Sequence, residues 1–287
     1  MNNVSIVSMK SFAKQLNDLT FTDYFYRLML LARSVFHWKN LPKGMDERWI
    51  ENFLFKHGEC VFWENPKTGL MVTECTRSGK LNNYEDPVSV TPVGIDIDPM
   101  ELKVGKECVI IRNNDESIPT AFPVQLFAYR LAEISRAIDI NINAQKTPVL
   151  VVTTDKQKLS LKNIYEKWNG FEPVIYGDKN LDTPELLRVL KTDAPVVFPD
   201  LQTQKQCIWN ECLTFLGINN ANTDKRERLI TEEVAANNTH IDLSADCLLK
   251  AREKAAEQIN ALFGTKISVE LREGVLEDVQ KVEEVEE

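Results

Sequence analysis

The chain contains 287 residues, of which 43% are hydrophobic and 27% are charged, values close to those of ordinary globular proteins. This composition excludes a chain that is disordered throughout, and it excludes collagen-like and low-complexity architectures. The formal net charge is −9 and the sequence pI is about 5.1, so any contact with DNA must come from local groups of basic residues rather than from bulk charge.

The sequence indicates neither a membrane-spanning segment nor a metal site. No apolar run approaches the roughly 18 residues that a transmembrane helix needs, and the first ten residues lack the basic and apolar regions of a secretory signal. We therefore expect a soluble, cytosolic protein with no membrane partner. The six cysteines form no CxxC pair and only three histidines are present, so we expect no metal ion and no cofactor.

The first 58 residues are expected to be helical, and the next 60 to form strands. Apolar residues recur at steps of three and four along a helix that ends before Asn40, and a shorter helix ends near Gly58. The apolar stripe consists of Tyr24, Leu28, Leu31, Val35 and Trp38. Residues 59–118 alternate short strand-like runs with turn residues, which predicts a small β-rich module. Its clearest strands are 60–63, 70–73 and 109–111.

The strongest helical pattern covers residues 120–146. Thr120 can cap the start of this helix, Pro123 is tolerated in its first turn, and Pro148 prevents its continuation. One face of the predicted helix is apolar. It consists of Leu126, Phe127, Leu131, Ile134, Ile138 and Ile142.

The remainder of the chain is predicted to mix strands and helices. Strands are expected at 149–152, 173–176 and 195–198, and helices at 159–168 and 184–190. A second long helix at 201–216 ends at Gly217, and a loop rich in Asn, Thr and charge follows. A third helix begins with Ser244 as its cap and ends at Gly264. A short strand at 266–271 and an acidic segment complete the pattern.

Common catalytic motifs are absent, including GxxxxGK[ST], GxGxxG, HExxH and GxSxG. One weaker pattern, Asp96 followed by Glu101 and Lys103, resembles the site of metal-dependent nucleases, in which two carboxylates hold magnesium and a lysine steadies the attacking water. A solvated surface loop is the competing interpretation. The basic cluster at residues 225–228 can either contact phosphate or form the solvated start of a helix.

Seven stretches match the order and spacing of one known family throughout residues 120–264. They are NAQKTPVL (143–150), LSLK (159–162), KTDAP (191–195), WNE (209–211), TFLGINNAN (214–222), KRERLITEEV (225–234) and LKARE (249–253). They resemble the portal protein, also called the upper collar or head-to-tail connector, of the smallest podophages (the picovirus group). Weaker similarities, WKNLP, IRNN and AFP, extend the resemblance toward the N-terminus.

The resemblance implies an α+β portal fold and a ring of twelve identical subunits at one vertex of the capsid. Double-stranded DNA would pass through the central channel, which long stem helices line, during packaging and ejection. The implied segments are an N-terminal helical wing segment (1–58), a β-rich wing with an SH3-like barrel (59–118), a stem helix (119–148), a clip (149–200), a second stem helix (201–217), a lumen loop (218–244), and a C-terminal helix of the wide end with an acidic tail (245–287).

The resemblance also implies partners and site residues. The partners are the DNA, the major capsid protein, the lower collar and tail proteins, a packaging ATPase and a packaging RNA. Family members can carry a basic N-terminus that suits the RNA, whereas residues 1–20 contain only Lys10 and Lys14 as basic residues. The expected DNA-channel contacts are Lys191, Lys225, Arg226 and Arg228. The expected subunit interface is formed by Leu126, Phe127, Leu131, Ile134 and Ile138, because a slim subunit cannot bury that stripe by itself.

These expectations describe a structural, non-enzymatic protein of the portal vertex of the virion, assembled in the host cytoplasm. Each basic group that neutralises a phosphate adds to the affinity for DNA. A ring of acidic subunits offers few such groups, so we expect DNA to slide through it without binding tightly. Two alternatives stay open at this point. One is a magnesium-dependent nuclease that uses Asp96, Glu101 and Lys103, and the other is an intracellular scaffold protein that binds partners through its helices.

Overall fold

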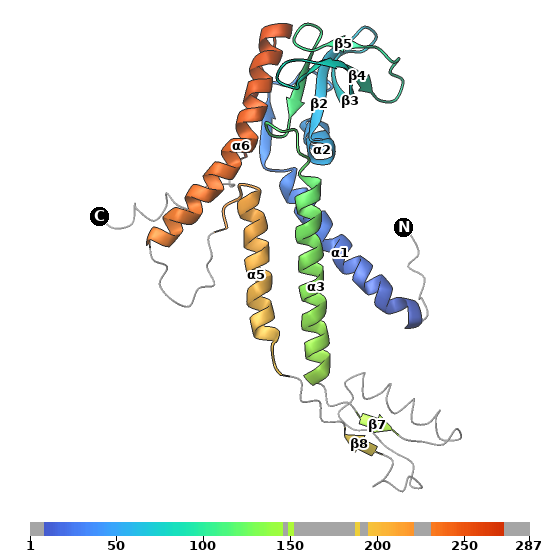
Figure 1. Ribbon diagram of the computed structural model, residues 1–287, viewed down its shortest axis with the longest axis vertical. Coiled ribbons are helices and arrows are strands. Elements are labelled where there is room, and N and C mark those ends of the chain that lie inside the picture. The colour runs from blue at the N-terminus through green and yellow to red at the C-terminus, as the bar shows by residue number, and fades with distance from the viewer. Residues whose placement is uncertain (1–8, 146–148, 152–186, 190–194, 221–230, 273–287) are drawn as a thin grey trace. The chain divides into compact units, whose positions relative to one another are not determined.

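The computed structural model describes residues 9–145, 149–151, 187–189, 195–220 and 231–272 (Figure 1). The chain divides into two compact units, which we describe separately. The larger unit contains residues 1–133 and 205–287, and the smaller unit contains residues 134–204. Two long helices, α3 (Ala121–Gln145) and α5 (Phe198–Phe215), each cross the boundary between the units.

The first half of the larger unit contains two helices and an antiparallel sheet. Helix α1 (Met9–Ala32), strand β1 (Phe36–Lys39) and helix α2 (Glu47–His57) come first. Five strands follow and pair in the order β5-β4-β3-β2-β6. They are β2 (Glu59–Asn65), β3 (Gly69–Leu81), β4 (Pro87–Val93), β5 (Leu102–Lys103) and β6 (Cys108–Arg112). This sheet is compatible with the small barrel expected for the wing.

The last part of the chain returns to the first part. Helix α6 (Thr231–Phe263) is followed by strand β9 (Ser268–Leu271), which pairs antiparallel with β1, so that Phe36 lies opposite Leu271. The two strands are more than 200 residues apart in the sequence. Their pairing places α6 beside the sheet and α2 (Figure 1).

Local signals in the sequence set both ends of α2. The Asp46 side chain accepts a hydrogen bond from the Arg48 N–H at the N-terminus, and Gly58 ends the helix in the left-handed region with φ 79°. The backbone of Ser117 approaches Gly58 so closely that a Cβ atom there would lie 1.9 Å from the Ser117 carbonyl oxygen. Glycine is therefore required at this position for both its φ and its size.

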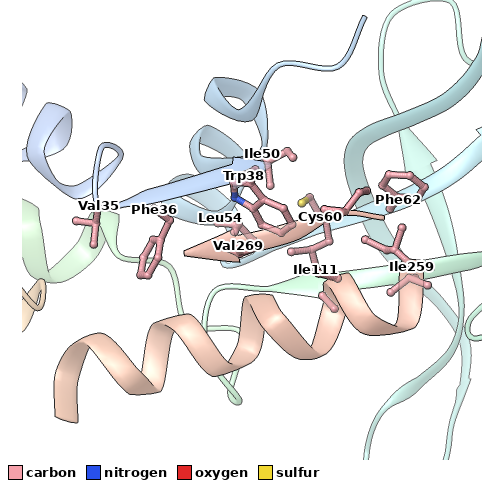
Figure 2. Close-up of a cluster of buried hydrophobic side chains, with 14 residues drawn as sticks. Val35, Phe36, Trp38, Ile50, Leu54, Cys60, Phe62, Ile111, Ile259 and Val269 are labelled. Atoms are coloured by element: carbon pink, nitrogen blue, oxygen red, sulfur yellow. The ribbon is translucent and has the colours of Figure 1, made fainter. Parts of the chain in front are cut away.

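The main core of the larger unit lies between α2, the sheet, the β1–β9 pair and α6. Figure 2 shows side chains from all four of these parts pointing toward one another. Trp38 from β1 and Ile259 from α6 are among the buried residues. The other labelled members are Val35, Phe36, Ile50, Leu54, Cys60, Phe62, Ile111 and Val269.

A second core joins α1 to the parts of α3 and α5 that belong to the larger unit. Ala128 and Ala132 are its small buried members on α3. Larger buried side chains fill the remaining space; they are Leu28, Val124, Leu131, Cys212 and Leu216. Gly217 ends α5 with φ 72°, where an added Cβ would lie 2.7 Å from Ala245 of α6.

A buried ion pair links α6 to α2. Arg252 and Glu51 have side chains that are 2% and 3% exposed, and two hydrogen bonds of 2.8 and 2.9 Å join them. The guanidinium also donates to the Asn113 carbonyl and amide oxygens and to the Leu248 carbonyl oxygen. All five of its N–H donors are therefore used.

Aromatic side chains complete the surroundings of this ion pair. The Trp38 indole N–H donates to Glu51 at 2.8 Å. The Arg252 guanidinium carbon lies 4.0 Å from the centre of the Phe36 ring, which is a favourable cation–π distance. The ion pair thus connects β1, α2, α6 and the segment after β6.

The described part of the smaller unit contains the antiparallel pair β7 (Val149–Val151) and β8 (Leu187–Val189). In the same unit, the Asn141 side chain of α3 holds the start of α5. Its amide nitrogen donates to the Pro195 carbonyl at 2.9 Å, and its oxygen accepts from the N–H groups of Val197 and Phe198 at 3.2 Å.

Most predicted elements are confirmed, including the helix at 120–146, the helix that ends near Gly58 and the strands at 60–63, 70–73 and 109–111. The prediction that one helix continues through Val35 and Trp38 is wrong, because α1 ends at Ala32 and Trp38 belongs to β1. The spacing of these two residues fits a helix, but pairing with β9 determines their conformation.

Three further boundaries also need correction. The third helix begins at Thr231 rather than at Ser244, so residues 231–244 of the expected lumen loop are helical; buried Ile241 and Ala245 continue its packed face. Residues 187–189 form β8 instead of the expected helix at 184–190, because they pair with β7. The expected strand at 195–198 is absent, since α5 already begins at Phe198. The predicted strand at 173–176 and helix at 159–168 lie outside the described residues.

We predict that Glu51→Gln destabilises the protein by about 3–5 kcal/mol, because it leaves the buried Arg252 without a counter-charge. Urea unfolding at one fixed protein concentration measures this change. Asp246→Asn is the matched control, since it removes an exposed ion pair with Lys250 on the same helix and should leave the unfolding midpoint unchanged. Equal midpoints for both variants would contradict a structural role of the buried pair.

We also predict that Gly58→Ala destabilises the protein clearly more than Gly105→Ala. Both glycines have positive φ, 79° and 77°, so each substitution adds backbone strain of about 1–2 kcal/mol. Only the Cβ at residue 58 meets another backbone, that of Ser117, whereas nothing lies within 4 Å of the Cβ at residue 105. The difference between the two unfolding free energies measures the cost of this contact, and a difference near zero would refute it.

Candidate functional site

Large apolar side chains are exposed on the outer faces of α3 and α1 in the larger unit. On α3, Phe122, Leu126 and Tyr129 are 69%, 52% and 55% exposed, and their spacing of four and three residues places them on one face. On α1, Tyr26 and Leu30 are exposed in the same way. Clustered exposed apolar groups of this kind mark surfaces that bind other proteins.

The structure divides the apolar stripe that the sequence predicted for α3. Leu126 is exposed, and the ring of Phe127 is half-buried against Phe215, with ring centroids 6.2 Å apart. Leu131 is fully buried between α1, α3 and α5 of the same chain. Leu131 therefore belongs to the core of its own chain, because α1 and α5 already cover it.

Phe122 and Tyr129 extend the exposed face of α3 and were not among the predicted interface residues. Their sequence signal is the spacing of four and three residues on either side of Leu126. In the smaller unit, Ile134 and Ile138 are half-buried and Ile140 is exposed. Helix α3 thus carries two apolar faces, one buried by its own chain and the other available to a partner.

The expected DNA-channel residues Lys191, Lys225, Arg226 and Arg228 lie outside the described residues. Helices α3 and α5 together contain three basic and four acidic residues. Arg136 pairs with Asp139 at 2.8 Å, and Lys205 lies 5.5 Å from the centre of the Tyr24 ring. The two long helices therefore carry almost no net charge along their length.

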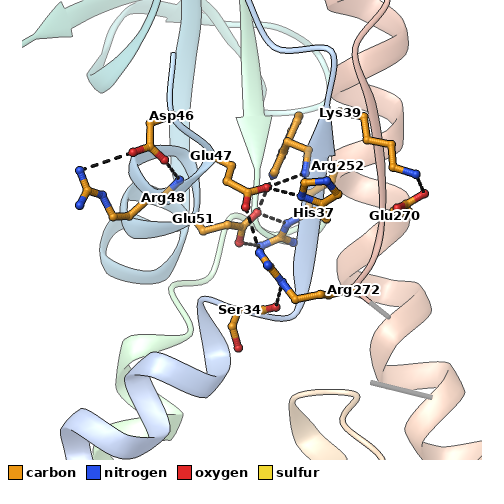
Figure 3. A network of polar contacts seen from close by, with 11 residues as sticks. Ser34, His37, Lys39, Asp46, Glu47, Arg48, Glu51, Arg252, Glu270 and Arg272 are labelled. Carbon is orange, nitrogen blue, oxygen red and sulfur yellow. Dashed lines mark hydrogen bonds and ion pairs between the residues drawn. The ribbon is translucent and has the colours of Figure 1, made fainter. Parts of the chain in front are cut away.

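A polar network fixes the β1–β9 pair against α2 (Figure 3). Glu47 accepts hydrogen bonds from the Trp38 backbone N–H and from Arg272, both at 2.9 Å, and lies 2.8 Å from the His37 ring. Burial alone would raise the pKa of Glu47, but these hydrogen bonds outweigh it and hold that pKa below its ordinary value. Glu47 is therefore a charged anchor at neutral pH.

Burial makes four of the six cysteines unreactive. Burial raises the pKa of Cys75, Cys108 and Cys212 to about 12, and it raises the pKa of fully buried Cys60 well above its ordinary value. Thiols in such surroundings stay protonated and are poor nucleophiles and metal ligands. Cys207 and Cys247 are exposed.

The nuclease alternative gains no support from the structure. The side chain of Glu101 accepts a hydrogen bond from the Ser89 hydroxyl, and the Lys103 backbone N–H donates to Glu107. Asp96 lies in the turn after β4. Among the residues that the structure describes, no group of three or more His, Cys, Asp or Glu side chains could hold a metal ion.

A cavity of about 330 Å³ lies between β4, β6 and α6. Its charged lining residues are Asp86, Arg112, Asp115 and Lys254, and Arg112 is already paired with Asp86. Two acidic and two basic groups balance each other, so the cavity favours neither anionic nor cationic ligands.

None of the helices within the described ranges has a stretch that is both long and apolar enough to cross a bilayer.

Comparisons with known proteins place these features in a family. Residues 5–276 match the family described as Phage Connector (GP10). A chain of the solved structure "Portal and tail of native bacteriophage P68" is similar with 15% sequence identity and a TM-score of 0.52, over 98% of this chain and 95% of that one. A chain of "Neck of native GTA particle computed with C12 symmetry" matches with 12% identity and a TM-score of 0.46, over 93% and 85% of the two chains.

The family match covers nearly the whole chain, and the P68 match shows that the fold is that of a phage portal chain. Both findings confirm the resemblance that the short stretches of sequence indicated. The chain belongs to the phage connector family.

Proposed function

We propose that the chain is the subunit of a dodecameric portal ring that conducts double-stranded DNA into the capsid during packaging and out of it during ejection. The observation that carries this proposal is the exposed apolar face of α3, formed by Phe122, Leu126 and Tyr129, in a chain of the phage connector family. An isolated subunit would leave this face in water. A closed ring of identical subunits covers it in every copy.

The proposed interface is heterologous, so that one surface of a subunit meets a different surface of the next. Interfaces of this kind generate a ring when the rotation between neighbours closes. Phe122, Leu126 and Tyr129 supply the large apolar anchors that dominate the energetics of many interfaces. Ile134 and Ile138, half-buried in the smaller unit, are proposed to continue the contact.

The charge of the chain supports a conduit more than a DNA-binding protein. Helices α3 and α5 have three basic and four acidic residues, so they offer few sites at which phosphates would release counterions. We propose that brief phosphate contacts come from Lys191 and from Lys225, Arg226 and Arg228. A ring built from subunits of charge −9 then guides the duplex without holding it.

The proposed function sets the partners of the ring. They are the major capsid protein around it, the lower collar and tail proteins below it, and a packaging ATPase with a packaging RNA during assembly. The similar solved chain comes from a structure of a portal and tail, which supports attachment of a tail. In this proposal the chain itself is structural and non-enzymatic.

We predict that Leu126→Asp prevents ring formation. The substitution places a charge in the centre of the proposed interface, whereas in the free subunit this side chain is exposed, so the fold should survive. Light scattering should then report about 32.8 kDa instead of twelve times that mass, with unchanged circular dichroism. Ile134→Asp tests the smaller unit; because Ile134 is half-buried, unchanged circular dichroism is required before its mass is interpreted.

The matched control for this experiment is Ile95→Asp, which changes an apolar residue that is 94% exposed in the turn after β4. This variant should form the ring. A ring of normal mass from Leu126→Asp would contradict the proposed interface. The scaffold alternative predicts a monomeric wild-type protein, so the same measurement separates it from a portal.

We predict that replacing Lys225, Arg226 and Arg228 together with Ser weakens retention of packaged DNA, because the phosphate contacts proposed for the channel are lost. The measurement is the fraction of DNA that stays protected from nuclease after packaging. A control variant with the same change of charge replaces the exposed Lys56, Lys80 and Lys106 with Ser and should retain DNA normally. Equal retention by both variants would remove residues 225–228 from the channel.

A further inference from the structure

Helix α6 presents an exposed face within the larger unit. Leu243 is 62% exposed, and His240 and Cys247 are exposed on either side of it along the helix. Their spacing of three and four residues places all three on one side of α6. Ile241 and Ala245, each 2% exposed, lie on the opposite side. We name His240, Leu243 and Cys247 the outer face of α6, and Phe122, Leu126 and Tyr129 the outer face of α3.

The two outer faces have the same length, and the same spacing when one of them is read backwards. On α3 the steps are four and then three residues, and on α6 they are three and then four. Each face therefore extends over about 10.5 Å of helix. Helix α3 begins beside the sheet, where Thr120 accepts a hydrogen bond from Asn113 at 2.8 Å. Helix α6 ends beside the sheet, where the rings of Phe263 and Phe62 lie 5.2 Å apart. The helices thus run in opposite directions, which brings the two sets of steps into register.

The two outer faces adjoin the same stretch of α5 and point away from it. Phe127, the neighbour of Leu126 in the sequence, contacts Phe215 near the end of α5, with ring centroids 6.2 Å apart. Gly217, two residues later, lies so close to Ala245 of α6 that an added Cβ would be 2.7 Å from it. The end of α5 therefore lies between α3 and α6 (Figure 1). A ring of identical subunits needs two such surfaces, which differ from one another and lie on opposite sides.

Charged residues border the two outer faces and do not interrupt them. Glu133 lies one turn beyond Tyr129 on α3, and Lys250 lies one turn beyond Cys247 on α6. Lys250 is paired with Asp246 on its own helix at 2.7 Å, so contact at this face would not strand its charge. An apolar centre with a polar rim is the usual anatomy of a protein–protein interface.

We propose that the outer face of α3 packs against the outer face of α6 of the neighbouring copy. This inference rests on the proposed function, because it names the surface that receives α3 in the ring. In a ring of twelve, neighbours differ by a rotation of about 30°, which keeps the two helices close to antiparallel. A second copy is the occupant because every copy carries both faces, so one rotation covers all of them. The paired residues are Leu126 with Leu243, Phe122 with Cys247, and Tyr129 with His240.

The native thiol of Cys247 gives the first test. It is exposed in the free subunit and should be covered in the ring, so that its reaction with N-ethylmaleimide slows on assembly. Peptide mass spectrometry measures this rate in the full-length variant I95C, whose introduced thiol, in the exposed turn after β4, is the internal reference. Relative to that reference, Cys247 should react at least several-fold more slowly in I95C rings than in I95C/L126D subunits. Equal relative rates would overturn the proposal.

Disulfide cross-linking then identifies the surface that covers Cys247. In the variant F122C/C207S, mild oxidation should join position 122 of one subunit to Cys247 of the next and give a ladder of multiples of 32.8 kDa on a denaturing gel. The controls F122C/C207S/C247S and I95C/C207S should give no ladder. The variant Y129C/H240C/C207S/C247S tests the other end of the same contact. All of these positions except Cys207 and Cys247 are changed at side chains that are exposed in the subunit, so the fold should survive.

Light scattering on the same samples separates failure of this contact from failure of the proposed function. Rings of normal mass that give no ladder with either cysteine pair would overturn the contact and leave the portal function in place. Slow labelling of Cys247 without a ladder would show that a different surface of the neighbour covers α6, and it would also overturn the proposal. A monomeric mass for the wild type would contradict the portal function itself, and the contact with it.

Discussion

The structure depends on one buried ion pair, between Arg252 of α6 and Glu51 of α2. Removing two charges from water is costly, and this cost is repaid only because every guanidinium donor has an acceptor and Glu51 also receives the Trp38 indole N–H. Hydrogen bonds depend on direction, whereas apolar contacts do not. Apolar side chains of the core would tolerate a small shift of α6, but a guanidinium with five hydrogen bonds would not. It therefore fixes the position of α6 along the sheet and the β1–β9 pair.

Elements whose conformation follows from local sequence could be predicted, and those that depend on distant partners could not. The capped ends of α2 and the long apolar period of α3 are local signals, and both are found in the structure. Trp38 keeps helical spacing with Val35 and Leu31, yet it forms a strand because β9 pairs with it from more than 200 residues away. Ser244 is a good helix cap by type, but packing of Ile241 and Ala245 extends α6 beyond it.

In the candidate site, too, some features follow from the local sequence and others depend on distant parts of the chain. The sequence identified α3 as the helix with excess apolar surface, and Leu126 is indeed exposed there. The sequence could not assign each apolar residue to a face, because the face depends on where α1 and α5 pack. Leu131 was expected to be exposed but is buried inside the chain. Phe122 and Tyr129 are exposed beside Leu126 but were not among the predicted interface residues. Likewise, Glu51 and Arg252 look like ordinary surface residues of amphipathic helices until the fold brings them together.

The pairing of β1 with β9 has a consequence for synthesis of the protein. Strand β1 is complete once residue 39 has been made, but its partner β9 is complete only once residue 271 has been made. The smaller unit, residues 134–204, is translated in between. A nascent chain therefore keeps one edge of its main core open until residues 268–271 have been made. The proposed ring would then have a natural order of assembly: each chain closes its own core by pairing β1 with β9, and only a closed chain can join its neighbours.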